Sequence, residues 1–107
     1  MIVFPNPTNT TRQKQIIGIA ARHKLPAIYP FDYYAKSGGL VSYGIDLNEQ
    51  FRLAAEYVDR ILRGAKPADL PVQQPNKYEL IINQRTARAL PLNIPGTVLA
   101  RADKVIE

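Results

Sequence analysis

Cysteine is absent from the 107 residues of this sequence, and histidine occurs once, as His23. Without cysteine the chain can form neither a disulfide framework nor a thiolate metal site. One histidine without cysteine cannot build a Cys/His metal cluster either. We therefore expect no metal site, and cysteine usage gives no indication of the redox compartment.

Long hydrophobic runs are also missing. No apolar stretch approaches the ~20 residues that a membrane-spanning helix requires. The apolar start Met1–Phe4 is too short for the hydrophobic region of a signal peptide, and Pro5 interrupts it. We expect neither membrane insertion nor a signal peptide within this chain.

Acidic residues are few, nine against fourteen basic ones, which gives a formal net charge of +5. A positive balance raises the question of nucleic-acid binding. The basic residues, however, are spread from Arg12 to Lys104 and mixed with acids, with no run of four or more. A generally basic, solvated surface explains the charge better, and nucleic acid is not an expected partner.

Catalytic and nucleotide-binding motifs are lacking as well. No G-x-S-x-G turn signals a nucleophilic serine, and Gly38, Gly39 and Gly44 fit neither common phosphate-binding loop. The scattered aspartates are most simply helix caps and surface residues. These absences predict a protein that is not an enzyme and holds no cofactor.

What the sequence does contain is a regular order of elements. Ile2–Phe4 and Leu25–Tyr29 are short apolar runs that end at proline, and the segment Thr10–His23 between them has helical spacing. Strand, helix, strand is the βαβ unit of a parallel sheet. The fold class predicted is α/β, a parallel sheet with flanking helices.

The remaining segments continue this pattern. The long amphipathic segment Asn48–Leu62, capped by Asp46 or Asn48, is the clearest helix. An extended, proline-rich connector follows, and only one βαβ crossover is evident, so part of the fold is expected to be missing upstream. The other expected elements are a short helix at Phe31–Lys36, strands at Leu40–Gly44 and Tyr78–Asn83, and helices at Thr86–Leu90 and Pro95–Ala102.

Small polar and aromatic residues stand at the ends of the expected strands. In open parallel sheets, ligands bind beyond the carboxyl ends of the strands, where such side chains supply stacking and hydrogen bonds. The alternative is that the tyrosines pack in the core or an interface, and that the serine only satisfies backbone groups at a bend. The predicted ligand-binding residues are Asn6, Thr8, Tyr29, Ser42 and Tyr43.

Three segments carry a family resemblance: Gly38–Gly44, Ile61–Val72 and Tyr78–Asn83. In these the sequence is similar to the ABC transporter substrate-binding protein family, of the tryptophan/tyrosine-type periplasmic binding proteins. The resemblance covers nearly all of the chain but only about the last third of the family's usual length. It implies that residues 1–107 are the C-terminal part of a two-lobed substrate-binding protein.

The resemblance implies a partial periplasmic-binding-protein type I fold whose first lobe is largely missing. Such proteins hold a small ligand in a cleft between two α/β lobes and deliver it to an ABC permease, which implies a periplasmic location. Leu40–Gly44 would be a strand that crosses to the first lobe. Asn6 stands where the family commonly has aspartate, so it lacks the negative charge that aspartate offers to a ligand ammonium.

Two hypotheses from different classes follow. The first is a solute-binding component of an ABC transporter that takes up an amino-acid-like or other small organic molecule. The second is a truncated structural remnant that associates with itself and binds no ligand, because apolar faces and strand edges would lack their usual cover. In both cases we expect a symmetric homo-oligomer, a dimer in the simplest case.

Overall fold

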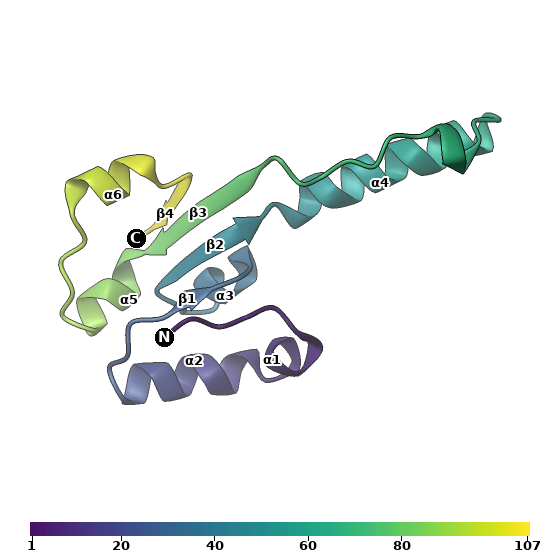
Figure 1. Cartoon of the computed structure of the whole chain (residues 1–107). Coiled ribbons are helices and arrows are strands. Elements are labelled where there is room, and N and C mark those ends of the chain that lie inside the picture. Colours follow the sequence, from purple (N-terminus) through teal and green to yellow (C-terminus); the bar gives the residue numbers. More distant parts are fainter.

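The computed structural model describes all 107 residues and contains one four-stranded sheet in the order β1-β2-β3-β4, flanked by helices (Figure 1). The α/β class is confirmed. The strands are β1 (Ile28–Tyr29), β2 (Val41–Ile45), β3 (Tyr78–Asn83) and β4 (Lys104–Ile106).

The sheet is mixed, which corrects the expected wholly parallel arrangement. β1 and β2 are parallel, as are β3 and β4, but β2 and β3 are antiparallel. The reason is the long excursion between the central strands, in which the chain leaves along a helix and returns beside it. β3 therefore re-enters the sheet at the end where β2 left it (Figure 1).

The N-terminal segment is less regular than predicted. Only Ile2 forms a β-bridge, to Ile28 in parallel, and the expected single helix is divided into α1 (Pro7–Thr11) and α2 (Gln13–Arg22). Helix α1 starts early because the Asn6 side chain caps it and proline occupies its first turn, a favoured position.

The central helices agree with the sequence analysis. Helix α3 spans Asp32–Lys36, and α4 spans Leu47–Leu62 with Asp46 as its side-chain cap. The return segment contains only a short 3-10 helix, η1 (Pro67–Asp69). Helix α4 contains no buried residue and extends away from the sheet together with the return segment (Figure 1).

At the C-terminal end, α5 (Gln84–Ala89) and α6 (Gly96–Arg101) are the two short helices that were expected. Strand β4, which follows α6, was not predicted. Its three residues are too few to show an alternating pattern. None of the helices combines the length and the apolarity that a membrane crossing requires.

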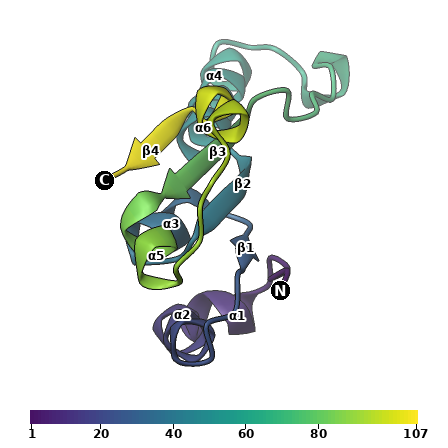
Figure 2. The same cartoon turned by 90° about the vertical axis from the view of Figure 1, so that its left-hand side faces the viewer.

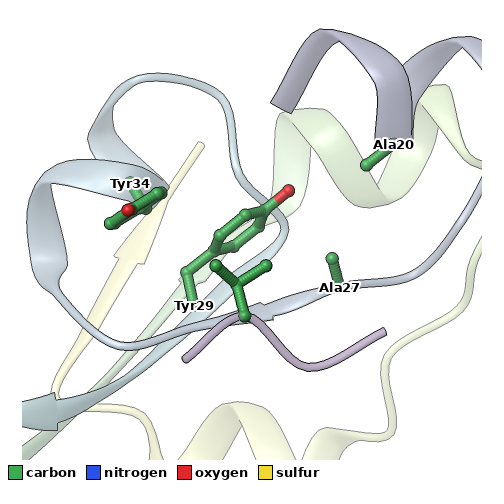
Figure 3. Close-up of a cluster of buried hydrophobic side chains, with 5 residues drawn as sticks. Ala20, Ala27, Tyr29 and Tyr34 are labelled. Atoms are coloured by element: carbon green, nitrogen blue, oxygen red, sulfur yellow. The ribbon is translucent and has the colours of Figure 1, made fainter. Parts of the chain in front are cut away.

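The hydrophobic core is small, since only 14 of 107 residues are buried. Its main cluster lies between α2, α3 and β1 and contains Val3, Ala20, Ala27, Tyr29 and Tyr34 (Figure 3). A second cluster joins Leu40 to α5. So little burial for this chain length agrees with a fold of which a part is missing.

Candidate functional site

The carboxyl ends of the N-terminal segment and of β1 meet at one edge of the sheet. The two backbones run in parallel, because Val3 donates a hydrogen bond to the Ile28 carbonyl at 2.9 Å and Ile28 donates to the Met1 carbonyl at 2.9 Å. Helices α1 and α3 both start just beyond this edge, which lies on the far side of the molecule in the view of Figure 2. Asn6 and Phe31 therefore lie where a ligand would enter a parallel sheet.

Asn6 is exposed, and half of its amide is already used. Its Oδ1 accepts a hydrogen bond from the Asn9 backbone N–H at 2.8 Å, which caps α1. Its Nδ2 donates to no group of the chain, so it is available to an acceptor from outside. Asn6 can thus offer a donor to a ligand, whereas its oxygen serves the helix.

The first turns of α1 bring further hydroxyl groups to the same edge. Thr8 is exposed, and only its backbone carbonyl is engaged, accepting from Arg12 N–H at 3.1 Å. The Thr10 hydroxyl lies 3.1 Å from the Asn6 carbonyl and 3.4 Å from the Tyr33 hydroxyl. The edge therefore presents several hydrogen-bonding groups on one short helix.

An aromatic row runs from this edge into the core. Ring centroids are 5.5 Å apart for Phe31 and Tyr33, 5.0 Å for Tyr33 and Tyr34, and 5.0 Å for Tyr34 and Tyr29, each pair being stacked. Phe31 and Tyr33 are half-buried, whereas Tyr34 and Tyr29 are fully buried. The row thus has an accessible end of Phe31 and Tyr33 and a buried end of Tyr34 and Tyr29.

Tyr29, predicted from the sequence as a ligand contact, stands at the buried end of that row. Only 1% of its surface is exposed, and Figure 3 shows its ring inside the main cluster. Burial, with Tyr34 as the lesser cause, raises the pKa of the Tyr29 hydroxyl. In the chain as it stands, its ring packs against protein.

Ser42 and Tyr43 point to opposite faces of β2, because side chains alternate along a strand. Ser42 is buried and pairs with Tyr29 in the register of β1 and β2. Tyr43 is 56% exposed and stacks on Tyr78 across the β2–β3 pair, with ring centroids 5.9 Å apart. Ligand contact by either residue stays a prediction.

The predicted residues therefore fall into three places. Asn6 and Thr8 share the exposed edge, Tyr29 and Ser42 are neighbours in the core, and Tyr43 lies on the other face of β2. Phe31 and Tyr33, the accessible end of the aromatic row, were not among the predicted ligand-binding residues. Their signal was the run Phe31-Asp32-Tyr33-Tyr34 directly after a strand end, a run that the sequence pattern assigned only to a helix.

A second polar group lies where β2 and β3 leave the sheet toward α4. The Asp46 carboxylate accepts hydrogen bonds from the backbone N–H groups of Asn48 and Glu49, at 3.0 and 3.3 Å, and lies 3.4 Å from Lys77 Nζ. The Glu49 N–H, with Lys77 as a further cause, lowers the pKa of Asp46. Desolvation, followed by the neighbouring Asp46 carboxylate, raises the pKa of Glu79.

Glu79→Gln is expected to raise the melting temperature at pH 7 by a few degrees. The pKa of Glu79 is higher in the folded than in the unfolded chain, so the ionised carboxylate destabilises the fold once the pH exceeds both pKa values. The neutral glutamine amide does not have this unfavourable charge. The gain should shrink as the pH falls toward the range in which carboxyl groups ordinarily titrate, because Glu79 then becomes protonated in the folded and unfolded states alike. Thermal melts from pH 4 to 8 measure it.

The matched control for this prediction is Glu56→Gln. It removes the same charge from an exposed carboxylate that is paired with Arg52 and should give no stabilisation. A Glu79→Gln variant with the same melting temperature as wild type at every pH would contradict the unfavourable charge at Glu79.

Known proteins resemble this chain along nearly its whole length. Residues 1–106 match the family described as ABC transporter substrate binding protein. A tyrosine-binding protein of Clostridioides difficile (strain R20291) is 33% identical over 72 residues, which are 67% of this chain and 21% of that protein.

Two solved structures share the fold closely. A conserved domain protein of Vibrio cholerae O1 biovar El Tor has a TM-score of 0.90 and 31% identity, covering 97% of this chain and 35% of that one. An ABC domain of Streptococcus pneumoniae, solved in complex with L-Trp, has a TM-score of 0.89 and 28% identity. The match covers 98% of this chain and 36% of that one.

The chain therefore spans about a fifth of the length of the curated relative and about a third of the length of these solved proteins. It has part of the fold of these solved proteins, as the sequence resemblance implied. A family match over residues 1–106 decides the classification. The chain belongs to the ABC transporter substrate-binding protein family.

Proposed function

We propose that residues 1–107 are the C-terminal part of a two-lobed substrate-binding protein and contribute one wall of a solute-binding cleft. The observation that carries the proposal is the family match, joined to a sheet edge where Asn6, Thr8 and the accessible end of the aromatic row lie together. Polar groups beside aromatic rings suit recognition of a small molecule without a reacting group. The proposed role is binding, not catalysis.

The proposed ligand is an aromatic amino acid. One relative is named for binding tyrosine, and a solved relative holds L-Trp. In this chain, Phe31 and Tyr33 offer a face on which an aromatic ring can stack. Asn6 Nδ2 can donate to the ligand carboxylate, and the partner for the ammonium group would come from the other wall of the cleft.

In transport, this protein would deliver its solute to an ABC permease on the outer side of the cytoplasmic membrane. The proposed location is therefore periplasmic or otherwise extracytoplasmic, as in the family. Neither a cofactor nor a metal is part of the proposed role.

Calorimetric titration of the chain with L-tyrosine, L-tryptophan and L-phenylalanine tests the ligand, with L-serine as the control solute. We expect heat of binding for the aromatic amino acids and none for serine. Phe31→Ala should abolish the heat while leaving circular dichroism unchanged. Titrations that are silent for every aromatic amino acid would favour the structural remnant over the binding protein.

Tyr43→Ala is expected to weaken ligand binding in a two-lobed parent protein far more than it lowers stability. Tyr43 is exposed, and the Tyr78 stack that it would lose is worth about 1 kcal/mol. Calorimetry and thermal melts measure the two effects. Tyr78→Ala is the control, since it removes the same stack. Equal losses of affinity and stability in Tyr43→Ala would assign Tyr43 to packing.

The second candidate, a self-associating remnant, is favoured by one observation: α4 contains no buried residue although it is strongly amphipathic. An uncovered apolar helix face favours association. We propose a homo-oligomer on this ground, and sedimentation across a dilution series tests it.

A further inference from the structure

One buried side-chain polar atom of the chain has no hydrogen-bond partner: the hydroxyl oxygen of Tyr34. The Tyr34 side chain is fully buried in the main cluster. A buried hydroxyl without a partner loses its hydration and gains nothing in return, so such groups are rare in native proteins. Burial is also the main cause that raises the pKa of Tyr34, which keeps the phenol protonated at neutral pH. Tyr34 is therefore a hydrogen-bond donor that lacks an acceptor within the chain.

The Tyr34 hydroxyl belongs to a group of three hydroxyls, here called the hydroxyl cluster: those of Thr10, Tyr33 and Tyr34. The Thr10 and Tyr33 hydroxyls are 3.4 Å apart, which is long for a hydrogen bond between two oxygens. The Thr10 hydroxyl also lies beside that of Tyr34, whose pKa it lowers. Thr10 donates its own hydrogen to the Asn6 carbonyl at 3.1 Å, so toward the tyrosines it can only accept. Two phenolic donors thus face one acceptor that holds neither of them closely.

Helix α1, which carries Thr10, is only weakly attached to the helix below the hydroxyl cluster. It has five residues, none of them buried, and its one side-chain contact with α3 is the long one between Thr10 and Tyr33. The start of α2 is held better, because Gln13 Nε2 donates to the Tyr33 carbonyl at 3.1 Å and to Ser37 Oγ at 2.8 Å. Helix α1 can therefore shift about Arg12, the non-helical residue between α1 and α2, while α2 and α3 stay in place.

The free polar groups at this edge are donors, and this selects the chemistry of their partner. They are the phenols of Tyr33 and Tyr34 and the Nδ2 group of Asn6. Asp32, the acidic residue of α3, is paired with Lys36, so its negative charge is compensated. A carboxylate only accepts, through two oxygens, and hydrogen bonds to an ionised acceptor are the strong ones. A ligand carboxylate is thus a partner that satisfies several of these donors at once.

The missing partner differs from the cover that the rest of a longer protein would give to exposed faces. Atoms of this chain itself enclose the Tyr34 hydroxyl, so a second protein wall packed on the outside would not reach it. A small molecule that binds beside the half-buried rings of Phe31 and Tyr33 reaches it when α1 shifts. A trapped water is the alternative partner, and it predicts a different change of stability on removal of the hydroxyl.

We propose that the hydroxyls of Tyr34 and Tyr33 form the subsite for the ligand carboxylate, and that α1 moves aside to admit it. This rests on the proposed binding of an aromatic amino acid and names the residues that distinguish it from an aromatic amine without a carboxylate. The ligand ring stacks at Phe31 and Tyr33, and the carboxylate lies at the hydroxyl end of the row. The chain keeps an unpaired hydroxyl, at some loss of stability, because recognition requires it.

Thermal melts without ligand give the first test, with Tyr34→Phe as the variant. It keeps the ring and removes the unpaired hydroxyl, so the melting temperature should rise by about 4–8 °C. A fall would show that the hydroxyl has a partner in the free chain, either Thr10 or a trapped water, and would overturn the proposal. Tyr29→Phe is the matched control: it removes a hydroxyl from the neighbouring stacked ring, and that hydroxyl points in another direction (Figure 3).

Calorimetric titration with L-tryptophan and tryptamine gives the second test. Tryptamine keeps the indole ring and the ammonium group and lacks the carboxylate. Tyr34→Phe should weaken the binding of L-tryptophan at least about tenfold, the usual loss for one hydrogen bond to a charged group. It should leave the affinity for tryptamine unchanged. Tyr29→Phe should bind both compounds as the wild type does.

The outcomes separate this proposal from the binding function on which it rests. Equal affinity of wild type and Tyr34→Phe for L-tryptophan would overturn the carboxylate subsite and keep the aromatic amino acid as ligand. Equal losses of affinity for both compounds would assign Tyr34 to ring packing and overturn the subsite as well. A wild-type chain that binds neither compound nor any other aromatic amino acid would overturn the binding function together with its subsite.

Discussion

Gly44→Ala is expected to lower the free energy of unfolding by about 3 kcal/mol or more. A Cβ atom at this position would lie 1.8 Å from the Pro30 carbonyl oxygen and 2.9 Å from the Pro30 carbonyl carbon. Both are backbone atoms, so the clash can be relieved only by moving the end of β1 away from β2. Such overpacking between strands is among the most damaging of single substitutions.

Urea denaturation followed by circular dichroism measures this loss, and Gly18→Ala is its control. Gly18 lies inside α2, and an added Cβ would meet no atom of another residue within 4 Å, so alanine there should stabilise by about 0.5–1 kcal/mol. A Gly44→Ala variant that unfolds at the wild-type urea concentration would show that β1 and β2 separate at little cost.

The position of Gly44 connects stability with the proposed role. It lies in β2, the strand that leads from the sheet into α4, and the Asp46 cap of α4 follows two residues later. A shift at Gly44 would therefore change the direction in which α4 leaves the sheet. In a two-lobed parent, the same shift would change how the lobes meet around a ligand.

The elements that the sequence predicted well are those with strong local signals. Helix α4 was recognisable because its cap, its amphipathic pattern and its final Arg63-Gly64 agree. Strand β3 was recognisable from its β-branched and aromatic residues. In each case the information lies within a few residues of the element itself.

The elements that were missed depend on contacts distant in sequence. The antiparallel pairing of β2 and β3 is set by the return segment 63–77, whose prolines indicate an extended chain but not its direction. Strand β4 forms because β3 offers a free edge to a segment too short to be identified alone. Such strand pairings can be predicted only when the partner strand is known.

The candidate site was predicted in the same uneven way. The rule that ligands bind beyond parallel strand ends located Asn6 and Thr8 at an exposed edge. The same rule does not indicate which face of the short strand β1 is covered by other parts of the chain. Ile28 is 45% exposed while its neighbour Tyr29 is buried, and a strand of two residues has too little pattern to reveal this.

Tyr29→Ala is expected to lower the free energy of unfolding by about 3–5 kcal/mol, the usual cost of removing a buried aromatic ring. The ring stacks on Tyr34 and lies within the main cluster, so its loss leaves a cavity beside α2 and β1. The ring also lies directly against Gly39, where an added Cβ would be 2.8 Å from it, and glycine has no side chain with which to fill the space that the ring would leave.

Tyr29→Phe is the control, because it keeps the ring and the stack and removes only the hydroxyl. It should unfold within about 1 kcal/mol of wild type. Chemical denaturation of both variants, with calorimetry against L-tyrosine, separates packing from recognition. Should Tyr29→Ala keep wild-type stability and lose only its binding heat, the ring would be a ligand contact after all. If instead stability falls as expected and Tyr29→Phe binds normally, Tyr29 is a packing residue, and Phe31 and Tyr33 at the accessible end of the row are left as the proposed stacking face.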